Sequence, residues 1–182
     1  MNQIENTLIE LTNLLNSNHI NWALGGSCML KLRGIELDVN DIDIMIHESD
    51  FEKCIELLNT VSMECEVKKS DVFKTRYYKK FKWNQTEIDC LSGMSIQLGL
   101  DLFEYQFDHK VSDIYLNGTV IPLCYIEDWF MLYQLMPNRG SKIIVIDEYF
   151  KSHMINKNRI QHLLDIKLPN QIREYLENYV KQ

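Results

Sequence analysis

Residues 23–46 read ALGGSCMLKLRGIELDVNDIDIMI, and this stretch decides the fold. An apolar run ends at two glycines and a serine, and further on Asp41 and Asp43 alternate with isoleucines. Alternation in a strand places the two aspartates on one face and the isoleucines on the other. Burying a carboxylate is costly unless something compensates its charge. The two aspartates therefore either face solvent or share a positively charged partner.

Length and composition indicate one globular domain, or one domain with a small appendage. The chain has 182 residues, of which 46% are hydrophobic and 25% charged, close to the globular average. No segment approaches the ~20 apolar residues of a membrane span. The first ten residues carry acids and lack the basic region of a secretory signal, so we expect a cytoplasmic protein. The five cysteines are widely spaced without a C-x-x-C pair, which favours reduced thiols.

The charge balance bears on the partner. Nineteen basic and 26 acidic residues give a net charge of −7. A nucleic-acid binder usually shows a basic face, so this balance makes nucleic acid an unlikely partner and favours a cationic or small polar one. The densest basic stretch, between residues 68 and 82, is short. An acidic groove formed by Asp101, Glu104 and Asp108 for a cationic acceptor is an alternative to their lying on a solvated face.

Hydrophobic periodicity predicts an α+β fold, with helices packed on a mixed sheet. Ser27 is expected to cap a short helix that Gly34 stops, and Asn117-Gly118 predicts a tight hairpin turn. We place an α+β domain at 1–124 and a helical C-terminal extension at 125–182, with residues 139–142 as a helix–helix turn. The expected strands are 20–24, 41–46, about 65–68, 97–107, 113–116, 119–123 and the two arms of a hairpin over 73–92. The expected helices are 3–17, 28–33, 51–60, 126–136, 140–151, 156–164 and 169–180.

The glycine-serine turn has a possible chemical role. Backbone N–H groups at a helix N-terminus attract phosphate, glycines allow a close approach, and a serine hydroxyl adds one donor. A plain tight turn is the alternative for Gly25, Gly26 and Ser27 taken alone.

The acids suggest a metal site. Two carboxylates at i and i+2 on a strand lie on one face and could share a divalent cation, although such pairs also occur on exposed faces. Residues 86–91 (TEIDCL) repeat the pattern with Glu87 and Asp89, and we prefer Asp89 because it lies deeper in the apolar run. If the two strands pair, three carboxylates could hold two metal ions, and the third could act as a general base.

Together these motifs resemble a known family. Gly-Gly-Ser, thirteen residues, Asp-x-Asp and a later strand aspartate resemble the nucleotidyltransferase superfamily of the DNA polymerase β type. Within it, WALGGS and DIDI are most similar to the small aminoglycoside and lincosamide nucleotidyltransferases, over residues 1–92. The resemblance implies a minimal nucleotidyltransferase fold and transfer of a nucleoside monophosphate, AMP from ATP as the favoured case, to a hydroxyl. The acceptor would be a small molecule such as an antibiotic, and pyrophosphate would be released.

Site residues follow from the same resemblance. Asp41, Asp43 and Asp89 would bind two Mg²⁺ ions and carry the catalysis, and Gly25, Gly26 and Ser27 would contact the phosphates of ATP or another nucleoside triphosphate. Relatives often carry a basic or small polar residue just before the first aspartate, where this chain has Val39-Asn40. Lys31 or Arg33 on the short helix, or Lys142 later, could supply the missing positive charge.

Three alternatives remain at this point. The acceptor could be a tRNA or a protein, as in the antitoxin-like branch of the superfamily. The chain could be a non-catalytic regulatory module that binds a nucleotide. It could also be an interaction domain whose Asp-x-Asp pair faces water. We expect no membrane partner, and either a monomer or a homodimer.

Overall fold

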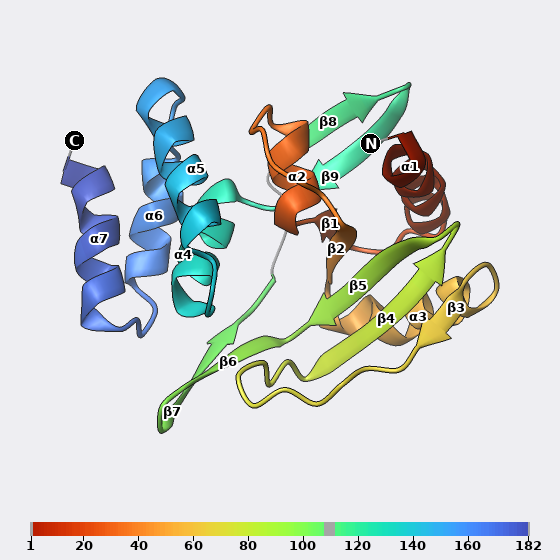
Figure 1. The fold of residues 1–182 in the computed structure, drawn as a ribbon, viewed down its shortest axis with the longest axis horizontal. Coiled ribbons are helices and arrows are strands. Elements are labelled where there is room, and N and C mark those ends of the chain that lie inside the picture. The colour runs from red at the N-terminus through yellow and green to blue at the C-terminus, as the bar shows by residue number, and fades with distance from the viewer. Residues whose placement is uncertain (1, 108–111, 182) are drawn as a thin grey trace.

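The computed structural model of the chain describes residues 2–107 and 112–181, with Asp108 outside this part (Figure 1). A seven-stranded mixed sheet runs in the order β3-β4-β5-β2-β1-β9-β8. Its members are β1 (Trp22–Leu24), β2 (Asp41–Ile46), β3 (Met63–Cys65), β4 (Tyr77–Trp83), β5 (Thr86–Ser92), β8 (Ser112–Leu116) and β9 (Thr119–Leu123). Strand β2 is parallel to β5 and antiparallel to β1, so the predicted α+β class with a mixed sheet is confirmed.

The structure confirms that aspartates and isoleucines alternate between the two faces of β2. Ile42 and Ile44 are fully buried, whereas Asp41 and Asp43 are only partly buried. Helix α1 (Asn2–Ser17) lies against β9, β2 and β5 with Leu8, Leu11 and Leu15 fully buried, and α3 (Phe51–Asn59) contacts β3 and β4. Helix α2 (Gly26–Leu32) contacts β2. The central strand is therefore covered where it is apolar and open where it is acidic.

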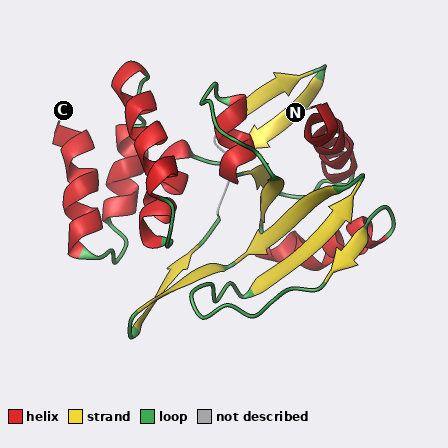
Figure 2. Ribbon diagram, viewed as in Figure 1, coloured by secondary structure: helices red, strands yellow, loops and turns green. Residues whose placement is uncertain are grey.

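The helices of the C-terminal part lie together on one side of the molecule (Figure 2). They are α4 (Ile126–Leu135), α5 (Gly140–Ser152), α6 (Lys157–Leu164) and α7 (Asn170–Lys181). Helix α4 contacts all three others, which explains why it is buried nearly all round. Inside it, Asp128 forms a bidentate pair with Arg159 at 2.6 Å and accepts a hydrogen bond from Tyr105. The division of the chain at residue 124 stays a prediction.

Several local expectations are corrected. Helix α2 begins at Gly26 rather than Cys28, and Ser27 lies inside its first turn instead of capping it. The single strand expected over 97–107 is two strands, β6 (Met94–Leu98) and β7 (Asp101–Tyr105), because Gly99 adopts a φ of +61° and reverses the chain. The expected strand at 65–68 is β3, which ends at Cys65, and the hairpin over 73–92 begins only at Tyr77.

Other expectations are confirmed. The hairpin turn falls at Asn84-Gln85 between β4 and β5, and a second lies at Asn117-Gly118 between β8 and β9; all four residues have positive φ, as such turns require. The four C-terminal helices lie within two residues of the predicted ranges. None of the helices in the described ranges is both long and apolar enough to span a membrane.

Candidate functional site

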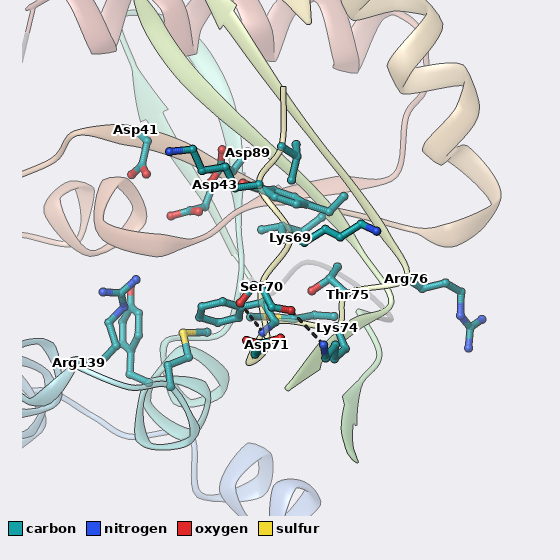
Figure 3. A pocket seen from close by; sticks show the side chains of 18 of the residues that line it. Asp41, Asp43, Lys69, Ser70, Asp71, Lys74, Thr75, Arg76, Asp89 and Arg139 are labelled. Carbon is teal, nitrogen blue, oxygen red and sulfur yellow. Dashed lines mark hydrogen bonds between the residues drawn. The ribbon is translucent and has the colours of Figure 1, made fainter. Parts of the chain in front are cut away.

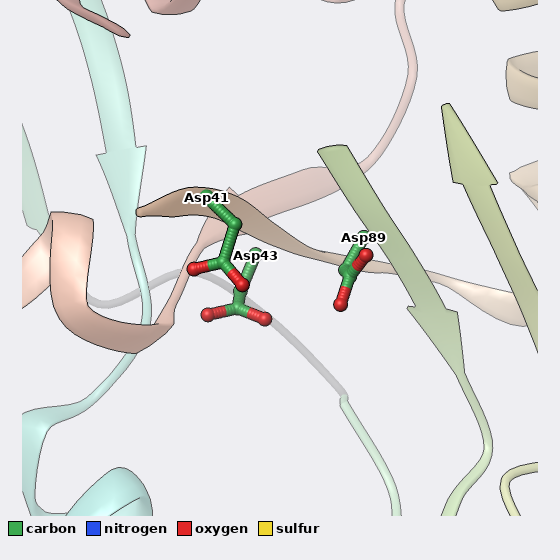
Figure 4. A group of neighbouring side chains, drawn as sticks. All are labelled: Asp41, Asp43 and Asp89. Carbon is green, nitrogen blue, oxygen red and sulfur yellow. The ribbon is translucent and has the colours of Figure 1, made fainter. Parts of the chain in front are cut away.

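Parallel pairing of β2 with β5 brings three carboxylates together. In the register of the two strands Asp43 lies opposite Asp89, and Asp41 lies opposite Glu87. Asp41, Asp43 and Asp89 each offer a carboxylate oxygen within 4.8 Å of the other two, and all three point to the same side of the strands (Figure 4). Glu87 is outside this group, with its side chain 52% exposed and paired with Lys80 at 2.9 Å. The third acid of the cluster is therefore Asp89, as the sequence favoured.

The cluster is electrostatically strained without a cation. Burial and then the proximity of Asp41 and Asp89 raise the pKa of Asp43 from 3.8 to about 7, against the lowering effect of Lys142 and Arg139. Burial likewise raises the pKa of Asp89. An all-oxygen group of crowded carboxylates matches the preference of Mg²⁺, whose charge would relieve this repulsion. The residues present therefore fit a divalent cation.

Asp89 is also held in position from the neighbouring strand. Lys80 lies directly opposite it in β4, and its ammonium is 3.2 Å from the Asp89 carboxylate. Tyr78 donates a hydrogen bond of 3.0 Å to the other carboxylate oxygen. An ion pair and a hydrogen bond from one strand thus fix the orientation of the third acid.

The glycine pair is required by close packing around the cluster. A Cβ on Gly26, which has a φ of +61°, would lie 1.8 Å from a carboxylate oxygen of Asp43, and one on Gly25 would lie 2.1 Å from the Trp129 indole. The backbone N–H of Gly25 also donates to the Asp43 carbonyl at 2.8 Å. Residues 25–27 are therefore more than a plain turn, because they place the start of α2 directly against the acids.

Positive charge comes from the C-terminal helices. The Lys142 ammonium donates a hydrogen bond to the Ser27 hydroxyl and lies 5.1 Å from the centre of the Tyr133 ring. Arg139 precedes α5 and, with Lys142, is close enough to lower the pKa of Asp43. Within the described chain the Arg139 Nε, the Tyr133 hydroxyl and the Trp129 indole N–H are buried without a hydrogen-bond partner. Such donors are costly to bury unless a ligand accepts from them.

Two other predicted cations lie elsewhere. The Lys31 ammonium pairs with Glu36, and the Arg33 guanidinium donates to the Ser112 hydroxyl at 3.2 Å and to the Cys124 carbonyl at 3.1 Å. Neither lines the cavity at the acids. The turn at Gly34 brings Glu36 to Lys31, and the expected contact of Lys31 with the nucleotide stays a prediction. Sequence reasoning missed Arg139, whose only signal was its place beside Lys142 in a turn.

One cavity of about 710 Å³ is lined by the three acids together with Trp129, Tyr133, Arg139 and Lys142, whereas Gly25, Gly26 and Ser27 lie behind its lining (Figure 3). The three acids lie at one end, Arg139 lies on one side, and Lys69, Ser70 and Lys74 lie on the other. Residues 67–76, between β3 and β4, supply much of the second side, and α4 and α5 supply the first. Asp101 and Glu104 do not line it, since they pair with Lys167 and Arg76. Among the described residues, Asp101 and Glu104 therefore form no acidic groove at this cavity and lie instead on a solvated face, the default interpretation of the sequence.

Comparison of the sequence with protein-family models and with curated proteins finds no match. Solved structures are similar in fold. A candidate nucleotidyltransferase from Thermotoga maritima aligns with a TM-score of 0.62 at 15% identity, over 81% of this chain and 92% of its own. The crystal structure of ANT(2'')-Ia with adenylyl-2''-tobramycin aligns at 0.56 and 10% identity, over 98% of both chains. The lincomycin-bound lincosamide adenylyltransferase LnuA aligns at 0.50 and 17% identity, over 77% and 94%.

At such low identities the similarity establishes the fold. The chain has the nucleotidyltransferase fold, in agreement with the resemblance read from Gly25, Gly26, Asp41 and Asp43. What the site does is a separate question, which depends on its own geometry.

Proposed function

We propose that this protein is a Mg²⁺-dependent nucleotidyltransferase that moves a nucleoside monophosphate, AMP from ATP as the favoured case, to a hydroxyl of a small molecule. The observation that carries the proposal is the convergence of Asp41, Asp43 and Asp89 within 4.8 Å at the end of a cavity. The nucleotidyltransferase fold and the adenylyltransferases among its structural neighbours support the same reaction.

Asp41, Asp43 and Asp89 would hold the metal. When bound, Mg²⁺ neutralises phosphate charge and lowers the pKa of a coordinated hydroxyl. The mutual repulsion of the three carboxylates, expressed in the raised pKa of Asp43, supports this assignment because each added positive charge would favour the ionised carboxylates.

The triphosphate would lie between the glycine turn and α5. Gly25 and Gly26 let the Trp129 indole and the Asp43 carboxylate pack directly against the start of α2, and Ser27 adds a hydroxyl already held by Lys142. Arg139 and Lys142 supply two cations beside Asp43, which the Val39-Asn40 dipeptide does not. Arginine and lysine close to a phosphate group add charge-assisted hydrogen bonds.

The acceptor hydroxyl would attack the α-phosphorus of the nucleotide. Its oxygen forms the new P–O bond, the bond to the bridging oxygen of pyrophosphate breaks, and pyrophosphate leaves with that electron pair. Asp89 is the base we assign to the hydroxyl proton, because Lys80 and Tyr78 fix its orientation beside the other two acids. The products are the nucleotidylated acceptor and pyrophosphate.

A screen of nucleoside triphosphates against acceptor panels tests this proposal. Purified protein with Mg²⁺ is expected to release pyrophosphate and to give a product whose mass increases by one nucleoside monophosphate. Asp89→Asn should lower turnover by about 10²–10⁴-fold, the usual contribution of a general base.

Glu87→Gln is the matched control, since Glu87 lies two residues away on the same strand but outside the cluster. It should keep most of the activity. Binding of nucleotide without pyrophosphate release under any condition would favour a regulatory module, and a product found only on RNA or protein would replace the small-molecule acceptor. Equal loss in the Asp89 and Glu87 variants would contradict the assigned roles.

A further inference from the structure

Positive charge is concentrated in one segment of this acidic chain. Residues 67–82 contain seven basic residues and one acidic residue, whereas the rest of the sequence contains 12 basic and 25 acidic ones. All of residues 67–76 except Val72 line the cavity, and Tyr78 of β4 lines it as well. The net charge of the protein is therefore opposite in sign to that of this side of its cavity.

Four of the seven basic residues form no ion pair with a described residue, and three of these four line the cavity. Lys79 pairs with Glu64, Lys80 pairs with Glu87 and Asp89, and Arg76 pairs with Glu48 and Glu104. Lys68, Lys69 and Lys74 line the cavity and form no ion pair with any described residue. Lys74 donates only to the Ser70 carbonyl, at 3.1 Å. The charge of these three side chains remains available to a ligand.

The triphosphate does not account for these lysines. Arg139 lies on the other side of the cavity (Figure 3). Lys142 also lines the cavity, and its ammonium donates to the Ser27 hydroxyl next to the glycine turn. Apart from the three clustered acids, Asp71 is the one carboxylate among the described residues that line the cavity. A cationic acceptor would therefore meet three lysines and a single acid, whereas an anionic one would meet three opposite charges.

We infer that the acceptor is an anionic small molecule, a hydroxyl compound that also carries a phosphate or carboxylate group bound by Lys68, Lys69 and Lys74. This inference rests on the proposed function and names its substrate class. The transfer is the one written above, with the acceptor's anionic group unchanged by the reaction. The exposed ring of Phe73 and the partly buried ring of Tyr78, also in the cavity, offer an apolar surface to the body of such a molecule.

Three hexoses that differ in charge test the inference. Protein saturated with Mg²⁺ and a non-hydrolysable ATP analogue is titrated with glucose, glucosamine and glucose 6-phosphate at constant ionic strength, and the dissociation constants are measured by calorimetry. Glucose 6-phosphate should bind about 10-fold more tightly than either of the others, because three charge contacts of about 0.5 kcal/mol each sum to about the 1.4 kcal/mol that corresponds to this ratio.

The lysines are tested by substitution to glutamine. The triple variant of Lys68, Lys69 and Lys74 should lose the preference for glucose 6-phosphate. A control triple variant combines Lys157→Gln, Lys167→Gln and Lys181→Gln, which remove the same amount of charge outside the cavity. This control should keep the preference for glucose 6-phosphate. Equal binding of all three hexoses by the wild type, tighter binding of glucosamine, or equal losses in both triple variants would overturn the inference.

Two further outcomes separate the inference from the proposed function. If the ATP analogue with Mg²⁺ does not bind the wild type, the proposed function itself fails. The analogue could instead bind together with a short RNA, but not with glucose 6-phosphate, in a way that depends on the three lysines. In that case the acceptor is a nucleic acid, and the inference fails while nucleotidyl transfer stands.

Discussion

Replacing Asp43 by asparagine should stabilise the protein in the absence of metal. Asp43 lies against Gly26 among the two other acids, and no hydrogen bond from a described residue reaches its carboxylate. A carboxyl whose pKa rises from 3.8 to about 7 on folding carries about 4 kcal/mol of unfavourable free energy when ionised. Partial exposure to solvent reduces this to about 1–3 kcal/mol. Asparagine keeps the shape and removes the charge.

The pH dependence has a defined sign. Because the pKa of Asp43 is higher in the folded than in the unfolded protein, the folded state binds more protons between about pH 4 and pH 7. The contribution of Asp43 to stability therefore decreases as pH rises through this window. The advantage of Asp43→Asn should be small at pH 4 and largest at pH 8.

Urea unfolding at pH 4, 6 and 8 in EDTA measures the effect. Asp101→Asn is the control, because Asp101 is a 76% exposed carboxylate that forms only a surface pair with Lys167. The control should change the free energy of unfolding by less than about 0.5 kcal/mol. With Mg²⁺ and a non-hydrolysable ATP analogue at 100 times Kd, the wild type should gain about 2.7 kcal/mol and Asp43→Asn much less. A variant less stable than the wild type at pH 8, or one that gains equally from Mg²⁺ and nucleotide, would refute the reasoning.

Three other substitutions follow from single contacts. Lys142→Met should raise the KM for ATP about 10-fold or more in steady-state kinetics, since a lost charged hydrogen bond costs about 1.5–3 kcal/mol. An unchanged KM would show that Lys142 does not contact the phosphates. Gly25→Ala should destabilise the fold in thermal melts because its Cβ would lie 2.1 Å from the Trp129 indole, whereas Gly140→Ala, with open space around it, should not; equal melting temperatures would contradict that packing. Arg159→Met should cost about 3–5 kcal/mol in urea unfolding because it leaves Asp128 buried and unpaired, and a loss below 1 kcal/mol would show that Asp128 finds another partner.

The sequence predicted the parts of the site that depend on local pattern. The alternation of Asp41 and Asp43 with isoleucines places them on the open face of β2, and the repeat at Asp89 identifies the strand that pairs with it. Turn chemistry at Asn117-Gly118 likewise defines a hairpin without reference to the rest of the chain. These features are set by neighbours within a few residues, which is the information that a single sequence contains.

The sequence could not predict contacts between distant segments. Arg139 and Trp129 come to the glycine turn only because α4 and α5 fold back onto the start of α2. Lys31 carries the expected charge but pairs with Glu36 after the chain turns at Gly34. Net charge was also a poor guide, because it averages over the whole surface, whereas the cavity is lined on one side by unpaired lysines.

Anomalous diffraction from crystals grown with Mn²⁺ and a non-hydrolysable ATP analogue tests the central claim most directly. Mn²⁺ has the ligand preferences of Mg²⁺ and a measurable anomalous signal, so its position is independent of any interpretation of activity. We predict a peak bounded by the carboxylates of Asp41, Asp43 and Asp89, with the triphosphate extending toward Lys142. Nucleotide bound elsewhere, or Mn²⁺ sites that leave these three acids without a metal, would contradict the account.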